Sequence, residues 1–290
     1  MGILNTLLSI GIVIVSQFGV ILLAAIGLAV IFGMMGIINL AHGEFILIGA
    51  YGTLLSTQVG IPLIISMLIG SLLAGVAGLI VEKAVVQHLY DRLVDSMVAT
   101  WGISLILTQG ALIVFGSSPG SVSTPFGSVS YGTVSVRLYS LVIAVSALLL
   151  VAITYIIFKH TEFGLHARAT MQDAETAENM GINTSRIYTT TFVFGSLLAG
   201  IAGSLLVPIS SVSPNLGSAY IVEAFVTVVV GGASVLVGSL SSAALLSIIS
   251  GTGVSVGSEL AGSVLLLLSA VIIIRLFPGG LTEYIEKKNI

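Results

Sequence analysis

Nine long apolar segments follow one another along this chain, and they constrain its fold more than any other feature. A membrane-spanning α-helix needs about 20 predominantly apolar residues, whereas a transmembrane β-strand has about ten residues in which apolar and polar side chains alternate. Only 7% of the residues are charged, against about a quarter in soluble domains. The sequence therefore predicts an all-α integral membrane protein, a single polytopic helical bundle over residues 1–290. The segments lie at residues 6–31, 45–60, 62–81, 97–115, 139–158, 187–208, 221–233, 235–250 and 260–277.

Two of these segments leave the number of spans open at eight or nine. Residues 221–233 and 235–250 are short and punctuated by glycine, which fits either a full hairpin or a broken, partly re-entrant pair. The first segment has no Lys or Arg before it, since the first basic residue is Lys83. A signal peptide begins with a positively charged region, so residues 7–31 are interpreted as a retained first span.

The basic residues predict the orientation of the bundle. Charges concentrate at residues 82–95, 159–186 and 275–288, and cytoplasmic loops carry the excess of Lys and Arg. All three regions are therefore placed in the cytoplasm. The Ser/Gly/Pro-rich outer loop, about residues 116–137, and the turn at 210–218 then lie outside, with Arg137 the single basic residue on that side. This arrangement predicts an outside N-terminus and a cytoplasmic C-terminus.

A polar island interrupts the apolar pattern at residues 39–44, where Asn39, His42 and Glu44 stand together between two apolar segments. Ionisable residues inside a membrane are rare and usually line a polar path or pair with a partner. They could contact a solute directly, or they could pair with each other or with backbone groups and so hold a broken helix. The spacing of His42 and Glu44 also resembles a zinc deaminase motif, but the chain has no Cys to complete such a ligand set.

A second polar island follows at residues 213–220, with Glu223 in the next apolar run. Transporters built from two repeats often interrupt helices at corresponding positions of the two halves. The two islands do not align without a gap, so an internal repeat is a hypothesis only. Small residues at four-residue spacing, which let helix backbones approach closely, are interpreted as packing positions at Gly70, Ala74 and Gly78 and at Gly195, Ala199 and Gly203.

The most polar part of the chain is residues 159–186. Residues 165–180 have the pattern of an amphipathic helix, and Gly181 follows as a plausible C-terminal glycine. Such a helix, projecting from a membrane bundle, is either a solvated loop helix or a docking element for a cytoplasmic partner.

Three separated motifs resemble those of one transporter family. Residues 37–51 read IINLAHGEFILIGAY, residues 163–186 hold the Phe-Gly, Arg-Ala, Gln-Asp and Met-Gly-Ile-Asn elements, and residues 229–239 hold Val-Val-Gly-Gly and Gly-Ser. Together they are similar to permease subunits of the branched-chain amino acid/urea class of ATP-binding-cassette (ABC) importers. Residues 89–107 and 214–225 are similar to the urea and short-amide branch of that class.

This resemblance implies a non-catalytic transport subunit of a prokaryotic inner membrane. The chain has no phosphate-binding loop, so ATP hydrolysis is expected from separate subunits. The chain itself is expected to hold no cofactor and no metal and to bind no nucleic acid. ATP and Mg²⁺ would be bound by two cytoplasmic ATP-binding subunits, an external solute-binding protein would deliver the solute, and a paralogous permease would complete a heterodimer in the bilayer. The coupling segment, about residues 159–186, would contact the ATPases through Gly164, Arg168, Asp173, Ala177, Met180, Gly181 and Ile182.

The solute is predicted to be urea or a short amide first, and a branched-chain amino acid next. A neutral, planar solute needs matched donors and acceptors, and the spans contain no Lys or Arg to hold a carboxylate. Trp101 could equally be an interfacial anchor or a packing residue. The residues predicted to line the translocation pathway are Asn39, His42, Glu44, Tyr51, Trp101, Ser104, Asn215, Tyr220 and Glu223.

Two functions of other classes compete with this prediction. A stand-alone urea or amide channel, or an ion-coupled carrier, would need no cytoplasmic docking helix. A membrane-embedded enzyme is disfavoured, because the sequence holds no nucleophile–base or metal-ligand constellation.

Overall fold

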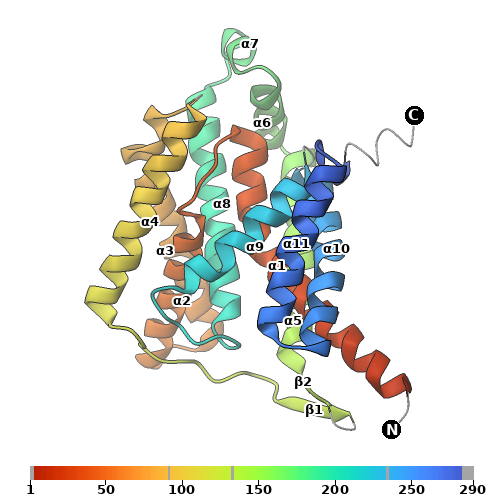
Figure 1. The fold of residues 1–290 in the computed structure, drawn as a ribbon. Helices are drawn as coiled ribbons and strands as arrows, with labels where there is room; N and C mark the ends of the chain where they lie inside the picture. Colours follow the sequence, from red (N-terminus) through yellow and green to blue (C-terminus); the bar gives the residue numbers. More distant parts are fainter. Residues whose placement is uncertain (1–2, 91, 132–133, 233–234, 283–290) are drawn as a thin grey trace.

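The computed structural model describes residues 3–90, 92–131, 134–232 and 235–282. Asp91 and residues 283–290, which belong to two of the charged regions, lie outside the described residues. Each of the nine predicted apolar segments is a helix (Figure 1). The nine are α1 (Ile3–Met35), α2 (His42–Gln58), α3 (Leu63–Ala84), α4 (Leu93–Phe115), α5 (Leu138–His160), α8 (Thr184–Leu206), α9 (Leu216–Gly231), α10 (Val235–Val256) and α11 (Glu259–Leu276).

Seven of these helices are long and apolar enough to cross a membrane, namely α1, α3, α4, α5, α8, α10 and α11. The other two are shorter: α2 has 17 residues and α9 has 16. At 1.5 Å per residue they are about 26 and 24 Å long, less than the ~30 Å hydrocarbon core of a bilayer. The prediction of a polytopic bundle with short helices is therefore confirmed, and the short ones are α2 and α9. Of the two segments predicted to be short, 221–233 lies in the short α9, but 235–250 lies in α10, which has 22 residues and is long enough to span.

The bundle contains two sets of four helices that run in opposite directions. Helices α1 to α4 alternate between the two ends of the molecule, and α8 to α11 alternate with the reverse sense (Figure 1). The packing is also matched, because α3 packs along α8 as α10 packs along α1, and the short helices α2 and α9 lie between them. This is the arrangement of an inverted repeat. The repeat that the sequence left as a hypothesis is thus visible in the topology.

The charged regions gather at one end of the bundle. The connection between α3 and α4, the segment between α5 and α8, and the end of α11 all lie at the end that carries the short helices α6 (Glu162–Gln172) and α7 (Ala174–Asn179) (Figure 1). The start of α1 and the connection between α4 and α5 lie at the opposite end. The sequence-based grouping of these loops into two sides is therefore confirmed.

The loop before α5 contains a small β-hairpin that the sequence analysis did not predict. Strand β1 (Ser128–Tyr131) pairs antiparallel with β2 (Val134–Arg137), and Ser128 lies opposite Arg137. The rest of the loop is fastened to the helix ends, because Thr124 donates a hydrogen bond of 2.7 Å to the Pro208 carbonyl and Gly120 forms a bridge with Val212. The loop therefore covers this end of the bundle.

Close helix contacts at small residues hold the centre together. A Cβ atom on Gly200 would lie 3.0 Å from the Ser71 backbone, and one on Gly203 would lie 2.8 Å from the Ile46 carbonyl carbon. At Gly78, a Cβ would overlap Ser196. The interpretation of these small residues as packing positions is therefore supported where α3, α8 and α2 meet.

The predicted single helix over residues 165–180 is wrong, because the structure divides it into α6 and α7. Asp173 has an extended backbone and caps α7 by accepting a hydrogen bond from the Thr176 amide (3.0 Å). A side-chain cap of this kind favours starting a new helix over continuing the old one. The predicted end is confirmed, since Gly181 follows α7 with a φ of +90°.

Candidate translocation site

The polar island at residues 39–44 lies in the middle of the bundle. After α1 ends, a non-helical stretch (residues 36–41) turns back along that helix, and α2 begins at His42. His42 is fully buried, and its Nε2 lies 3.0 Å from the carbonyl oxygen of Ala24. Because Ala24 precedes the end of α1 by 11 residues, α2 begins about 16 Å below that end. Non-helical backbone at such depth is tolerated where protein surrounds it.

Side chains and neighbouring helices fix this stretch. The Asn39 Oδ1 accepts a hydrogen bond from the Ala41 amide (3.0 Å), and the Leu40 amide donates to the hydroxyl of Thr100 on α4 (3.0 Å). The backbone groups released by ending α1 are thus partly satisfied by polar side chains. This observation supports the interpretation that the island holds a broken helix.

The same island also has unused hydrogen-bonding capacity. Asn39 Nδ2, His42 Nδ1, Glu44 Oε2 and the Tyr51 hydroxyl are buried without a partner, and they are four of the seven such side-chain atoms in the described part of the chain. Buried polar groups in native proteins are normally paired. These atoms comprise donors, an acceptor and an imidazole nitrogen that can be either. They can therefore bind water or a polar solute at this point.

A row of hydroxyl groups on α4 faces the island. The Ser104 hydroxyl donates to Glu44 Oε1 (2.9 Å), and Thr108 also lies beside that carboxylate. Thr100, Ser104 and Thr108 are spaced four residues apart and so share one face of the helix. Ser104 was predicted from the sequence, whereas the two threonines were not; their four-residue spacing from Ser104 is a weak signal, because a helical Thr commonly bonds its own backbone.

Tyr51 and Trp101 are placed differently by the structure. The Tyr51 ring packs against Phe115 of α4, with 4.8 Å between ring centroids, so Tyr51 and Glu44 point toward the same neighbouring helix, as their seven-residue spacing predicts. The Trp101 side chain is 56% exposed. Within this chain, Trp101 therefore lies on the outer surface of α4 and away from the buried polar groups.

The two polar islands meet through their backbones. Gly43 in the first turn of α2 packs against Gly217 in the first turn of α9, where a Cβ on Gly217 would lie 2.6 Å from the Gly43 carbonyl carbon. Asn215 precedes α9 and its side chain is exposed. The starts of the two short helices are thus brought together, which the sequence did not predict, and the side chains of the second island point elsewhere.

Tyr220 and Glu223 line a separate polar cavity of about 430 Å³. It lies at the end of the bundle that carries the β-hairpin, and Arg137 lines it too. The sequence analysis assigned Arg137 to the outer loop and missed this role, because only the fold brings the end of β2 beside α9.

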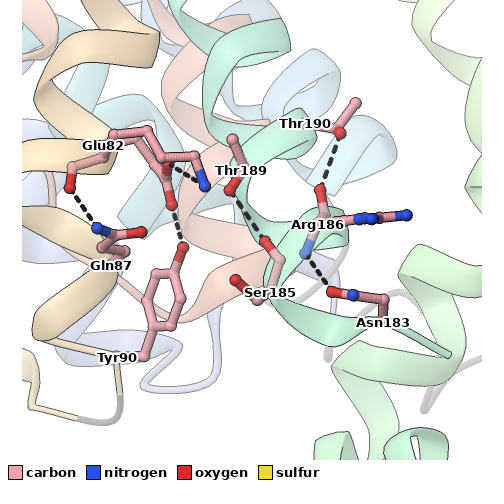
Figure 2. A network of polar contacts seen from close by, with 9 residues as sticks. Glu82, Gln87, Tyr90, Asn183, Ser185, Arg186, Thr189 and Thr190 are labelled. Atoms are coloured by element: carbon pink, nitrogen blue, oxygen red, sulfur yellow. Dashed lines mark hydrogen bonds and ion pairs between the residues drawn. The ribbon is translucent and has the colours of Figure 1, made fainter.

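A polar network stabilises the opposite end, beside the short helices (Figure 2). Glu82 at the end of α3 is fully buried and accepts a hydrogen bond from the Tyr90 hydroxyl. The Tyr90 ring packs on Tyr188 of α8, with 4.7 Å between centroids. Burial, together with the contact to Glu82, raises the pKa of Tyr90 well above its ordinary value. This network fastens α3 to the start of α8.

The residues predicted to couple to ATPases lie at that same end. Arg168 donates a hydrogen bond to the Phe158 carbonyl at the end of α5, and Gly164 packs so closely that a Cβ would lie 2.5 Å from the Phe158 carbonyl carbon. Gly164 and Arg168 therefore attach α6 to α5. The contacts described for these two residues are thus with another helix of the same chain.

The remaining residues of the segment shape α7 and its exit. Asp173 caps the helix, and hydrogen bonds from the Thr176 amide and hydroxyl lower the pKa of its carboxyl group. Ala177 is buried and its carbonyl accepts a hydrogen bond from the Ile182 amide (3.0 Å). The Met180 side chain is 80% exposed, so the tip of the segment presents an apolar surface.

Comparison with known proteins identifies the family. The family model described as "Branched-chain amino acid transport system / permease component" matches residues 11–276. The chain is similar to the high-affinity branched-chain amino acid permease LivH of Escherichia coli K12 (26% identity over 78% of this chain and 79% of the relative) and to a probable LivH of Methanocaldococcus jannaschii (27% over 92% and 90%). It is also similar to the ribose import permease RbsC of Haemophilus influenzae (31% over 78% and 69%).

No solved structure matches the chain. The family match nonetheless covers all nine apolar helices up to the last residue of α11 except the first turns of α1. It also includes the central polar island, the segment with α6 and α7, and the polar cavity. The chain therefore belongs to the family of permease components of branched-chain amino acid transport systems.

Proposed function

We propose that this chain is the membrane permease subunit of an ABC importer, and that its solute is a branched-chain amino acid. The family match over residues 11–276 carries the proposal. The urea and short-amide preference expected from sequence gains no support from the relatives, whose names give branched-chain amino acids and sugars as their solutes. Urea and ribose are therefore comparison solutes in the test.

The segment with α6 and α7 is the proposed contact with the ATPase subunits. It projects from the bundle at the end where the charged regions gather (Figure 1). Its tip exposes the apolar side chains of Leu165, Met171 and Met180, which would be covered by a partner. By the distribution of Lys and Arg this end is cytoplasmic, which places the β-hairpin outside, facing the solute-binding protein, in the inner membrane.

The central polar island is the proposed narrow part of the pathway. In this structure Gly43 packs against Gly217, and His42 and Glu44 are buried. Movement of α2 relative to α9 would separate the two helix starts. The unpaired groups of Asn39, His42 and Glu44 would then replace solute hydration during passage.

The decisive experiment is transport by the reconstituted importer. We expect ATP-dependent uptake of leucine into proteoliposomes that contain this permease, its paralogous partner and the two ATPase subunits, with the external binding protein added. Urea and ribose serve as matched solutes in the same vesicles. Omission of the ATPase subunits should abolish uptake.

Two results would contradict the proposal. Solute entry with this chain alone would establish a stand-alone channel or an ion-coupled carrier. ATP-dependent uptake of urea or ribose without uptake of leucine would retain the importer and exclude the proposed solute.

A further inference from the structure

The cavity that holds Tyr220 and Glu223 is polar on almost every side. Of its twelve lining residues, ten are polar or charged, and Val20 and Ile209 are the two aliphatic ones. They come from five helices and two connecting segments. The polar members are Ser16 and Gln17 of α1, Arg137 of β2, Ser140 of α5, Ser210 of the connection between α8 and α9, Tyr220 and Glu223 of α9, Ser250 of α10, and Glu259 and Ser263 of α11.

Charges of both signs line this one cavity without neutralising each other. The ion pairs within 4.0 Å among the described residues are Lys83 with Glu82 and Arg92 with Asp95. Arg137 is therefore not paired with Glu223 or Glu259, although all three border the same space. The cavity thus has one positive group and two negative groups that form no ion pair with one another.

A zwitterion is the ligand that such a cavity fits. A guanidinium binds a carboxylate through two parallel hydrogen bonds, and two carboxylates can accept hydrogen bonds from an ammonium, which has three donors. A neutral solute such as urea would leave the charges unpaired on one or both sides. At about 430 Å³ the cavity is within the range of small-molecule pockets.

We propose that this cavity is a recognition site for a zwitterionic amino acid at the outer end of the permease. Arg137 binds the α-carboxylate, Glu223 and Glu259 bind the α-ammonium, and Val20 and Ile209 contact the side chain. The inference rests on the proposed function, and it assigns the solute's charged groups to residues outside the central island. It also gives the β-hairpin a role, because Arg137 is the last residue of β2.

Equilibrium binding to the assembled permease–ATPase complex in lipid nanodiscs, without the external binding protein, tests the assignment. Three probes separate the two charges: leucine has both, 4-methylpentanoate lacks the ammonium, and leucinamide lacks the carboxylate. We expect Arg137→Gln to weaken the binding of leucine and of 4-methylpentanoate by about tenfold, which is about 1.4 kcal/mol. The binding of leucinamide should stay nearly unchanged. Glu223→Gln and Glu259→Gln should weaken the binding of leucine and leucinamide and leave the binding of 4-methylpentanoate unchanged.

Two controls keep the result interpretable. Arg137→Lys retains the positive charge but not the two parallel hydrogen bonds, so it should weaken leucine binding less than Arg137→Gln does. Asp95→Asn removes an exposed carboxylate in the first turn of α4, at the opposite end of the molecule, and should change none of the three affinities. Equal losses for all three probes, or no loss with Arg137→Gln, would overturn the proposed site.

The transport assay separates this inference from the proposed function. Normal ATP-dependent leucine uptake together with charge-independent binding would contradict the cavity assignment and leave the importer intact. Charge-selective binding in a complex without ATP-dependent uptake would support the cavity and contradict the importer.

Discussion

The contact between the starts of α2 and α9 provides the sharpest test of the structure. Gly217→Ala would place a methyl group 2.6 Å from the Gly43 carbonyl carbon and 3.2 Å from the Glu44 amide nitrogen. Favourable carbon contacts lie at about 3.5–4.0 Å, so the two helices would have to separate by about 1 Å. Both neighbouring atoms belong to backbone, and no side-chain rotation can relieve the overlap.

The expected change in the free energy of unfolding is the sum of two opposing contributions. Overpacking of this kind destabilises by about 1–3 kcal/mol, and replacing a helical Gly by Ala gains about 0.5–1 kcal/mol. Gly102→Ala in the middle of α4 is the matched control, because a Cβ there meets no atom within 4 Å. The Gly102→Ala variant should therefore show only the stabilisation gained by replacing a helical glycine. The free energies of unfolding of the two variants should therefore differ by about 1–3 kcal/mol.

The measurement is equilibrium unfolding of the purified chain in mixed micelles, followed by circular dichroism. Leucine uptake by the reconstituted complex should fall for Gly217→Ala and stay normal for Gly102→Ala, because the overlap displaces Glu44 from Ser104. Equal stability of the two variants would show that α2 and α9 do not meet at these glycines, and the description of the central site would then be wrong.

Four further predictions concern other parts of the chain. Tyr90→Phe leaves the buried Glu82 without its donor and should lower the free energy of unfolding by about 1–3 kcal/mol, measured as above; no change would exclude a structural role for this pair. Arg168→Glu removes the hydrogen bond to Phe158 and should abolish ATP-dependent uptake while membrane insertion, judged by protease protection, stays normal; unchanged uptake would refute the docking role. Glu44→Gln keeps the side-chain size but removes the charge beside Ser104, and should reduce the maximal uptake rate in the same vesicles, whereas a normal rate would exclude Glu44 from the pathway. The pKa of Asp173 is lowered in the folded protein, so its stabilisation of α7 is complete above the unfolded-state pKa of about 3.8 and is lost as the pH falls through the folded-state pKa. Asp173→Asn should remove this pH dependence from the protection of the Thr176 amide against hydrogen exchange. An unaltered profile would contradict the capping role of Asp173.

The helices could be predicted from the sequence because the bilayer imposes a simple rule. A span needs a continuous apolar segment of limited length, and all nine segments contain helices. The division of the loops between the two ends of the bundle could also be predicted, because successive spans run in opposite directions. The hairpin of β1 and β2 was missed, since four-residue strands in a Ser/Gly-rich loop carry almost no periodicity.

The central site was predicted in part. Asn39, His42 and Glu44 stand out in sequence because polar groups are costly in a membrane. Thr100 and Thr108 do not, since a helical Thr can satisfy its hydroxyl on its own backbone. Arg137 and Glu259 could not be assigned to one cavity with Glu223, because they lie far apart along the chain and only tertiary packing brings them together.

The route by which force would reach the pathway can be followed along one helix. Asn183 caps α8 directly after α7, since its Oδ1 accepts a hydrogen bond from the Arg186 amide (3.0 Å). Helix α8 then runs through the bundle to Gly203, which packs on the backbone of α2 at Ile46, two residues after Glu44. Because the contact of Gly203 with Ile46 is between backbones, a displacement of α8 by ATPases docked at α7 would shift α2 with little loss through side-chain movement. Under the proposed function, the close glycine packing of α8 is thus what would connect the cytoplasmic segment to the junction of α2 and α9.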